Sequence, residues 1–247
     1  MSEMPEVVPP AKEPIFKAPG VVLALIGLFV AIHLVIQWAG EDWRVWSLFA
    51  FSFIPARISG GVPFPAIYGS QVWSFLTYAF LHGNWSHLFS NCLWFLVFGT
   101  VVARRLGTAK FLLLCAISTI TGAAALLVTH WGDGGNVIGA SGAVSGLMAA
   151  ATPVMFGTRL PAVDPDRSGE ASIIPLKPSE ILSSRGAVVF LLVFFVATLY
   201  SGATGWTGTS YVENATIAWE AHLGGFVAGF LTFFLLDHRM DLPSVQS

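Results

Sequence analysis

Charged residues are scarce in this chain of 247 residues: Asp, Glu, Lys and Arg together make up only 11% of it. Hydrophobic residues make up 55%, and the mean hydropathy is +0.72, values far from the usual composition of a soluble domain. The net charge of −2 gives no basic field that would hold nucleic acid. We therefore predict a membrane protein whose partners lie in the lipid bilayer.

The chain also has few residues that would serve redox or metal chemistry. Its two cysteines, Cys92 and Cys115, both stand in apolar stretches, where a free thiol behaves as a small hydrophobic side chain. They indicate no redox compartment. Neither a phosphate-binding loop nor a zinc-ligand spacing occurs in the sequence, so we predict no metal and no cofactor.

Six apolar segments approach the roughly 20 residues that a membrane-spanning helix needs. They cover approximately residues 21–39, 76–101, 111–130, 140–157, 187–202 and 216–236. We therefore predict an all-α membrane protein with six transmembrane helices. The predicted parts are a tail at 1–20, a membrane domain at 21–236 that includes a linker at 158–186, and a tail at 237–247.

Basic residues are distributed unevenly around these segments. With the N-terminus inside, ten of the twelve Lys and Arg residues fall on the inner side, and only Arg44 and Arg57 fall outside. This asymmetry predicts that both termini and the linker are cytoplasmic. The outer connection at 40–75 is too apolar for a solvated linker and too interrupted for a span, so we expect it to lie in the membrane interface. Another outer connection, at 201–215, is rich in glycine and is expected to move above the space between the helices.

A serine and a histidine stand in two of the apolar segments. Ser141 lies at the outer end of the fourth segment, in the sequence Gly-Ala-Ser-Gly, and His222 lies inside the sixth, in Ala-His-Leu-Gly-Gly. Polar groups at membrane depth are costly and are usually functional. A serine and a histidine form the minimal pair of nucleophile and base. At a helix start, the N–H group of Ser141 is an unpaired donor, and the helix dipole favours a developing oxyanion.

Small residues follow both side chains at helical spacing. Gly142 and Gly146 share one face of the fourth helix, and Gly225 and Gly229 share one face of the sixth with His222. Small residues allow membrane helices to pack backbone to backbone. Contact between the two faces is expected to bring the Ser141 hydroxyl within reach of the His222 ring.

A third polar cluster stands at the start of the second predicted helix. His87 and Asn91 are four residues apart and share a helix face, and His82 precedes them. Two inward-pointing donors on one face suit an oxyanion, and no carboxylate completes a metal site at helical spacing. Each of these residues alone also suits a packing role. Because all three clusters occur on the same side of the membrane, we favour a catalytic role over a packing role.

The chain resembles the rhomboid intramembrane serine proteases over approximately residues 20–236. The resemblance rests on these motifs, which agree with that family in their order along the chain, their side of the membrane and their spacing. The resemblance implies that Ser141 is the nucleophile and His222 the general base and acid, in a dyad without an acidic member. It implies that His87, Asn91 and the Ser141 backbone N–H form the oxyanion hole, with His82 in support. The expected substrates are transmembrane proteins, and the expected location is the bacterial inner membrane.

Three positions depart from the family pattern. Ser74 follows Trp73 where many rhomboids have arginine, Ser145 stands where an aromatic residue commonly supports the catalytic histidine, and Ile217 stands where glycine often occurs. Two other classes of function remain. An inactive rhomboid-like membrane chaperone is expected to have lost Ser141 or His222. A small proton-coupled transporter is expected to carry more intramembrane carboxylates than Glu220 alone.

Overall fold

The computed structural model describes residues 18–60, 67–159, 173–204 and 218–237. These ranges form α1 (Gly20–Trp38), α2 (Glu41–Phe51), α3 (Ala56–Ser59), α4 (Ser70–Thr77), η1 (Tyr78–Phe80), α5 (Trp85–Leu106), α6 (Thr108–Thr129), α7 (Ser141–Met155), β1 (Thr158–Arg159), β2 (Ile173–Ile174), α8 (Pro178–Ile181), α9 (Arg185–Thr204) and α10 (Trp219–Leu236). Most of both predicted tails, the middle of the linker and the glycine-rich connection around Gly208 lie outside the described residues, as does Ile217.

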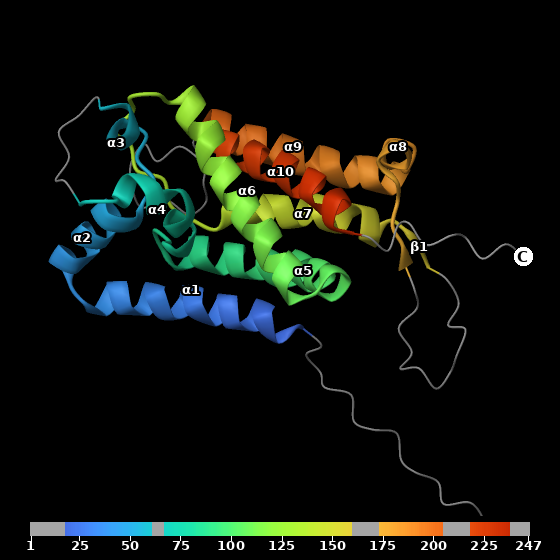
Figure 1. The fold of residues 1–247 in the computed structure, drawn as a ribbon, viewed down its shortest axis with the longest axis horizontal. Coiled ribbons are helices and arrows are strands. Elements are labelled where there is room, and N and C mark those ends of the chain that lie inside the picture. Colours follow the sequence, from blue (N-terminus) through green and yellow to red (C-terminus); the bar gives the residue numbers. More distant parts are fainter. Residues whose placement is uncertain (1–17, 61–66, 160–172, 205–217, 238–247) are drawn as a thin grey trace, which may run out of the picture.

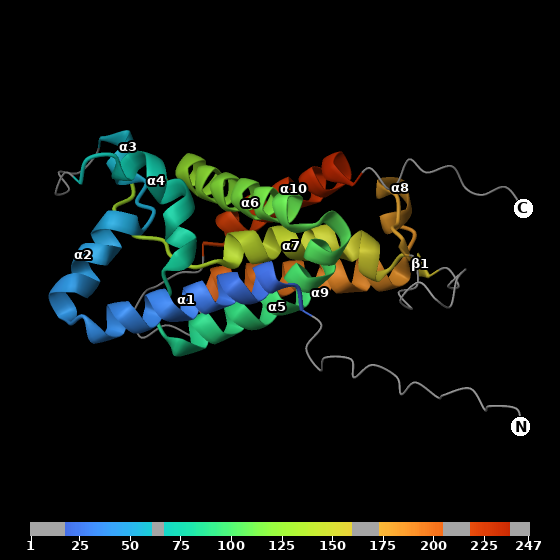
Figure 2. The same cartoon turned by 60° about the horizontal axis from the view of Figure 1, so that its bottom comes forward.

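The long helices run side by side, with α7 among them (Figures 1 and 2). Helix α7 packs against α5, α6 and α10, while α1 packs against α5 and α9 against α10. Short helices α2, α3 and α4 gather at one end of the bundle, and β1 and α8 lie at the other (Figure 1). The predicted outer connection and the predicted cytoplasmic linker therefore lie at opposite ends.

Four helices in the described part of the chain, α1, α5, α6 and α10, are long and apolar enough to cross a membrane. Helix α7 and residues Arg185–Tyr200 of α9 are apolar but shorter. Several tryptophans are exposed at the end of the bundle that holds α2 to α4, where an aromatic ring suits the headgroup level. They are Trp38, Trp43, Trp46, Trp85 and Trp131. The structure thus has the character of a helical multi-pass membrane protein.

The second apolar segment, at approximately residues 76–101, begins before the helix that it contains. Helix α5 starts only at Trp85, and His82 precedes it as expected. The Asn84 side chain accepts a hydrogen bond from the His87 N–H at 2.8 Å and caps the first turn. Residues 70–80 instead form α4 and η1, after which Leu81 is extended. The cap therefore fixes where the second span starts.

A short β-ribbon accompanies the helices of this predominantly helical fold. Strands β1 and β2 pair antiparallel, with Thr158 opposite Ile174 and Arg159 opposite Ile173. This two-residue ribbon and α8 lie in the predicted linker. Elements this short leave no long apolar segment in the sequence. Arg105 at the end of α5 donates to the Ile173 carbonyl at 3.0 Å and attaches the ribbon to the bundle.

The outer connection folds back on itself through its backbone carbonyls. The last turn of α2 carries carbonyl groups without partners inside the helix. Three side chains donate to the carbonyls of residues 49–52: the Trp73 indole at 2.8 Å, the Thr77 hydroxyl at 2.9 Å, and the Arg57 guanidinium, which reaches two of them. Ser74, which stands where many rhomboids have arginine, is buried and brings no guanidinium to this connection. Arg57 on α3 supplies one instead.

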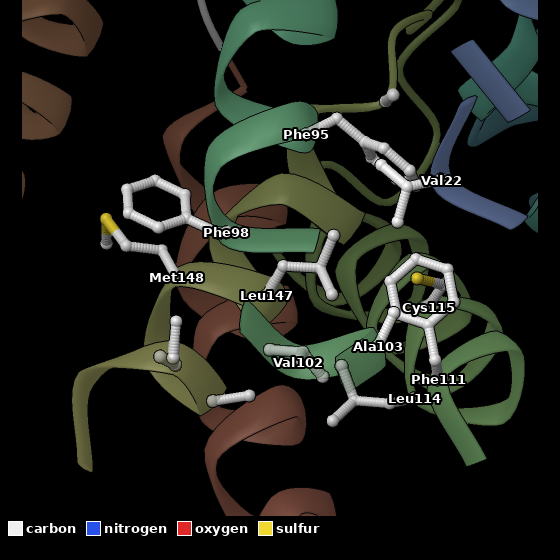
Figure 3. Packing of buried hydrophobic residues seen from close by; sticks show 14 of the residues in the cluster. Val22, Phe95, Phe98, Val102, Ala103, Phe111, Leu114, Cys115, Leu147 and Met148 are labelled. Atoms are coloured by element: carbon white, nitrogen blue, oxygen red, sulfur yellow. The ribbon is translucent and has the colours of Figure 1, made fainter. Parts of the chain in front are cut away.

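The main apolar core surrounds α7 and joins it to α1, α5 and α6 (Figure 3). Its fully buried members, with at most 1% exposure, include Val22, Phe95, Val102, Phe111, Leu114 and Leu147. Lipid is as apolar as these side chains, so their contribution in a membrane is close packing and not removal from water. The core fixes the position of α7, which begins at Ser141.

Candidate active site

The loop that leads to Ser141 is fixed by main-chain hydrogen bonds. Val137 and Phe53 exchange two of them, at 2.8 and 3.0 Å, and the Gly139 N–H donates to the Tyr78 carbonyl at 2.9 Å. Gly139 has a φ of +117°, which side-chain-bearing residues rarely adopt. A Cβ at this glycine would lie 2.6 Å from Nε2 of His87. The loop therefore needs glycine here, and the His87 ring lies directly against it.

Helices α7 and α10 touch through the glycines that the sequence singled out. A Cβ on Gly225 would lie 2.2 Å from the Gly142 carbonyl oxygen, and one on Gly229 would lie 2.3 Å from the Gly146 Cα. The order of these contacts makes the two helices parallel, with their N-terminal ends together. Ser141 is the first residue of α7, and His222 lies in the first turn of α10.

A cavity of about 980 Å³ lies at this end of the bundle, and all five candidate polar residues line it. These residues are Ser141, His222, His87, Asn91 and His82. Among the described residues, no hydrogen bond joins the Ser141 hydroxyl to the His222 ring. Catalytic hydrogen bonds are often long in proteins without substrate and shorten when it binds.

The cluster on α5 presents amide and imidazole groups to the same cavity. Asn91 is buried, and its side-chain N–H donates to the His87 carbonyl at 2.9 Å. An amide carries two N–H donors, so a second one is left for a ligand. The His82 ring packs edge-on against the His87 ring, with centroids 5.2 Å apart. Burial lowers the pKa of His82 to about 3, so this ring is neutral at physiological pH.

A fourth histidine approaches this cluster from α1. His33 stands alone in the middle of the first span, and its buried ring packs edge-on against Trp85 with centroids 4.6 Å apart. Phe29, one turn earlier on α1, packs against His82 at 5.7 Å. Helix α1 thus supports the loop before α5. The signal in the sequence was an isolated histidine in the middle of a span.

Two further polar residues near the pair have other partners. The Glu220 carboxylate lies 3.8 Å from Nδ1 of His130, at the end of α6. The Ser145 hydroxyl donates to the Ser141 carbonyl at 2.8 Å. Among the described residues, no aromatic ring packs against His222. Ser145, the second departure from the family pattern, thus brings no aromatic ring to the side of His222.

The cavity extends between α5 and α9. Trp94 and Phe98 line it from α5, and Phe190 and Phe194 line it from α9. The two helices meet at Phe98 and Phe190, whose ring centroids are 5.9 Å apart. Nearer the outer end, His87 on α5 and Thr198 on α9 also line the cavity. The part of the cavity between these two helices is called the lateral opening below.

A helical bundle that crosses the membrane around a cavity lined by serine, histidine and asparagine defines a membrane protein with a polar centre. The part of the chain that the structure describes holds no group of three His, Cys, Asp or Glu side chains placed to bind a metal. Residues 69–239 match the family model of the rhomboid domain. The chain belongs to the rhomboid family.

Several rhomboid proteins are similar to most of this chain. It is 25% identical over 215 residues to a protein named "Rhomboid protease GlpG" from Salmonella paratyphi A, covering 87% of this chain and 61% of the relative. It is 25% identical over 232 residues to the protein of the same name from Yersinia pestis, covering 91% and 65%. The chain thus spans less than two thirds of the length of these relatives.

Proposed function

We propose that this protein is an intramembrane serine endopeptidase that cleaves the membrane-spanning segments of other proteins. The observation that carries the proposal is the convergence of Ser141, His222, His87 and Asn91 on one cavity, at the end where α7 and α10 pack through glycine. Membership of the rhomboid family supports it, as do the names of the relatives, which are called proteases.

In this proposal Ser141 and His222 act as a dyad. The Ser141 oxygen attacks the carbonyl carbon of the scissile peptide bond while the His222 ring accepts the hydroxyl proton. The same ring then returns the proton to the leaving amine as the C–N bond breaks. Water, activated by His222, releases the acyl group from Ser141. Glu220 takes no part, because it faces His130 at the end of α6.

The negative charge on the former carbonyl oxygen needs donors that are in place before reaction. The Ser141 N–H has no acceptor inside the helix, because it belongs to the first residue of α7. The second amide N–H of Asn91 and the ring of His87 supply the others from α5. His82 packs on the His87 ring and holds its orientation.

The lateral opening between α5 and α9 suggests how a substrate helix enters. In this proposal a bilayer partner reaches the cavity sideways between α5 and α9. Water reaches it from the end of the bundle that carries α2 to α4 (Figure 1). We infer six spans, with α7 and α9 as the fourth and fifth, and cytoplasmic termini in a bacterial inner membrane. Substrate cleavage is then expected near the outer end of a span.

The test is cleavage of a single-span membrane substrate together with labelling by a fluorophosphonate. Ser141→Ala and His222→Ala should each abolish cleavage and labelling while the protein remains folded, because the two residues act as a unit. Ser183→Ala is a matched control, because Ser183 does not line this cavity, and it should retain both activities. Cleavage near the wild-type rate in either dyad variant would refute the dyad.

A further inference from the structure

Tyr78 is a buried aromatic residue to which neither the sequence motifs nor the proposed dyad assign a role. It begins η1 and is only 2% exposed. Its ring packs near Phe53, with centroids 6.2 Å apart. Its hydroxyl donates to the Thr119 carbonyl on α6 at 3.0 Å. The side chain thus crosses from the outer connection into the interior of the bundle.

The Tyr78 hydroxyl lies where three helices come together. A Cβ on Gly142 of α7 would lie 2.9 Å from this oxygen, and a Cβ on Gly122 of α6 would lie 3.2 Å from it. The same added atom on Gly122 would lie 2.7 Å from the carbonyl oxygen of Ala221 on α10. Gly142 follows Ser141 in the chain, and Ala221 precedes His222. The hydroxyl therefore lies among the chain neighbours of both proposed dyad residues.

The main chain of Tyr78 holds the same region from the other side. Its carbonyl accepts the hydrogen bond from the Gly139 N–H at 2.9 Å, two residues before Ser141. One residue thus contacts the loop that enters α7 through its carbonyl, and the first turn of α7 through its phenol. The phenol is rigid and its hydroxyl is bonded to α6, so neither contact moves independently of the bundle.

We propose that Tyr78 is a positioning residue, which sets the placement of Ser141 relative to His222 through its hydroxyl. The assignment rests on the proposed dyad. Tyr78 does not act on the reacting atoms: it holds the first turn of α7 at a fixed distance from α6 and from Ala221 of α10. A misplacement of about 1 Å at a catalytic group can lower a rate by about a hundredfold. Loss of the hydroxyl is therefore expected to affect the chemical step more than substrate binding.

The test is Tyr78→Phe, which keeps the ring and removes the hydroxyl. Its kcat should fall by about 10- to 100-fold with KM within about twofold of wild type, since substrate reaches the cavity unchanged. The rate of Ser141 labelling by a fluorophosphonate should fall by a similar factor. Phe53→Leu is the matched control, because it loosens the packing of the same ring without touching the hydroxyl. Both variants are measured well below their thermal midpoints.

A Phe53→Leu variant with a lowered thermal midpoint and a wild-type labelling rate would support the assignment. Three results would overturn it: a Tyr78→Phe variant with wild-type kcat, one in which only KM rises, or an equal loss of labelling in both variants. If Ser141 of the wild-type protein is neither labelled nor needed for cleavage, the proposed dyad fails, and the role of Tyr78 fails with it. A fully active Tyr78→Phe variant beside an active wild type contradicts the role of Tyr78 alone.

Discussion

Gly225 lies so close to Gly142 that a Cβ on Gly225 would be 2.2 Å from the Gly142 carbonyl oxygen. Real Cβ atoms do not approach an oxygen this closely, so any larger residue must push α10 away from α7. The atom in the way belongs to the backbone, which cannot rotate aside as a side chain can. Because Gly142 follows Ser141 and Gly225 lies one turn after His222, this contact sets how far apart the two helix starts lie.

The first prediction concerns this contact. Gly225→Ala should destabilise the protein by at least about 2 kcal/mol, because overpacking a close helix contact forces the backbones apart. It should also lower cleavage, since His222 moves with α10. Gly27→Ala is the control, because a Cβ on Gly27 in α1 would meet nothing within 4 Å. Thermal unfolding in detergent and cleavage rates are the measurements. Wild-type values for Gly225→Ala would show that the helices do not pack this closely.

The residue pattern indicates which side chains line the cavity, while the catalytic roles assigned to them stay predictions. Spacings of three and four residues place Gly225 and Gly229 on the face of His222, and helix packing through small residues follows from that face. The positions depend on local periodicity and on the end of each span. The structure keeps the helical periodicity and the position of these residues near the ends of their helices. Ser141, His87 and His222 line one cavity there.

The outer connection was not predictable in the same way. Helix α2 ends where Arg57, Trp73 and Thr77 donate to its carbonyls, and two of these donors lie more than 20 residues further along the chain. A repeat of apolar residues along one helix does not predict contacts between residues so far apart in the sequence. The late start of α5 was readable in principle from Asn84, which is a favourable N-cap residue, but the apolar residues before it favoured a longer span. The role of Tyr78 depends on three helices that only the fold brings together.

The second prediction separates stabilisation of the transition state from substrate binding on α5. Asn91→Ala should lower kcat by about a hundred- to a thousandfold, roughly 3 to 4 kcal/mol, with little change in KM, as for other oxyanion donors. Ser90→Ala is a matched control, because the Ser90 hydroxyl also donates to the His87 carbonyl, at 3.1 Å. It should retain most of the activity.

His87→Ala should show the same pattern as Asn91→Ala. Since both donors would stabilise one charge, the double variant should lose less than the sum of the single losses. If Asn91→Ala raises KM at constant kcat, the cluster binds substrate and is not an oxyanion hole.

The third prediction concerns the lateral opening between α5 and α9. Cysteines at Ser90 and Thr198, both of which line the cavity, can be bridged by a bifunctional thiol reagent in a background without Cys92 and Cys115. The bridge should suppress cleavage of a membrane-embedded substrate far more than labelling of Ser141 by a small fluorophosphonate, since only the substrate helix needs the helices to separate. The unbridged double variant is the control. Equal loss of both activities would indicate general distortion in place of gating.

The last prediction is a pH dependence of stability that arises from His82. Burial lowers the pKa of this ring to about 3, helped by the neighbouring rings of His87 and His33, whereas an unfolded histidine titrates near 6.5. Below pH 6.5 the unfolded chain therefore binds a proton that the folded chain does not, so stability is lost as the pH falls. Between pH 7 and pH 5 this group alone should cost about 2 kcal/mol.

His82→Gln removes the titrating group and should make the thermal midpoint less dependent on pH over this range than in the wild-type protein. Gly27→Ala is the control, because a Cβ on Gly27 would meet nothing within 4 Å and every histidine stays in place, and it should keep the wild-type dependence. The comparison between variants isolates His82 from the other histidines of the cluster, which are present in both. An unchanged pH dependence in His82→Gln would show that the His82 ring is hydrated enough to be protonated in the folded protein.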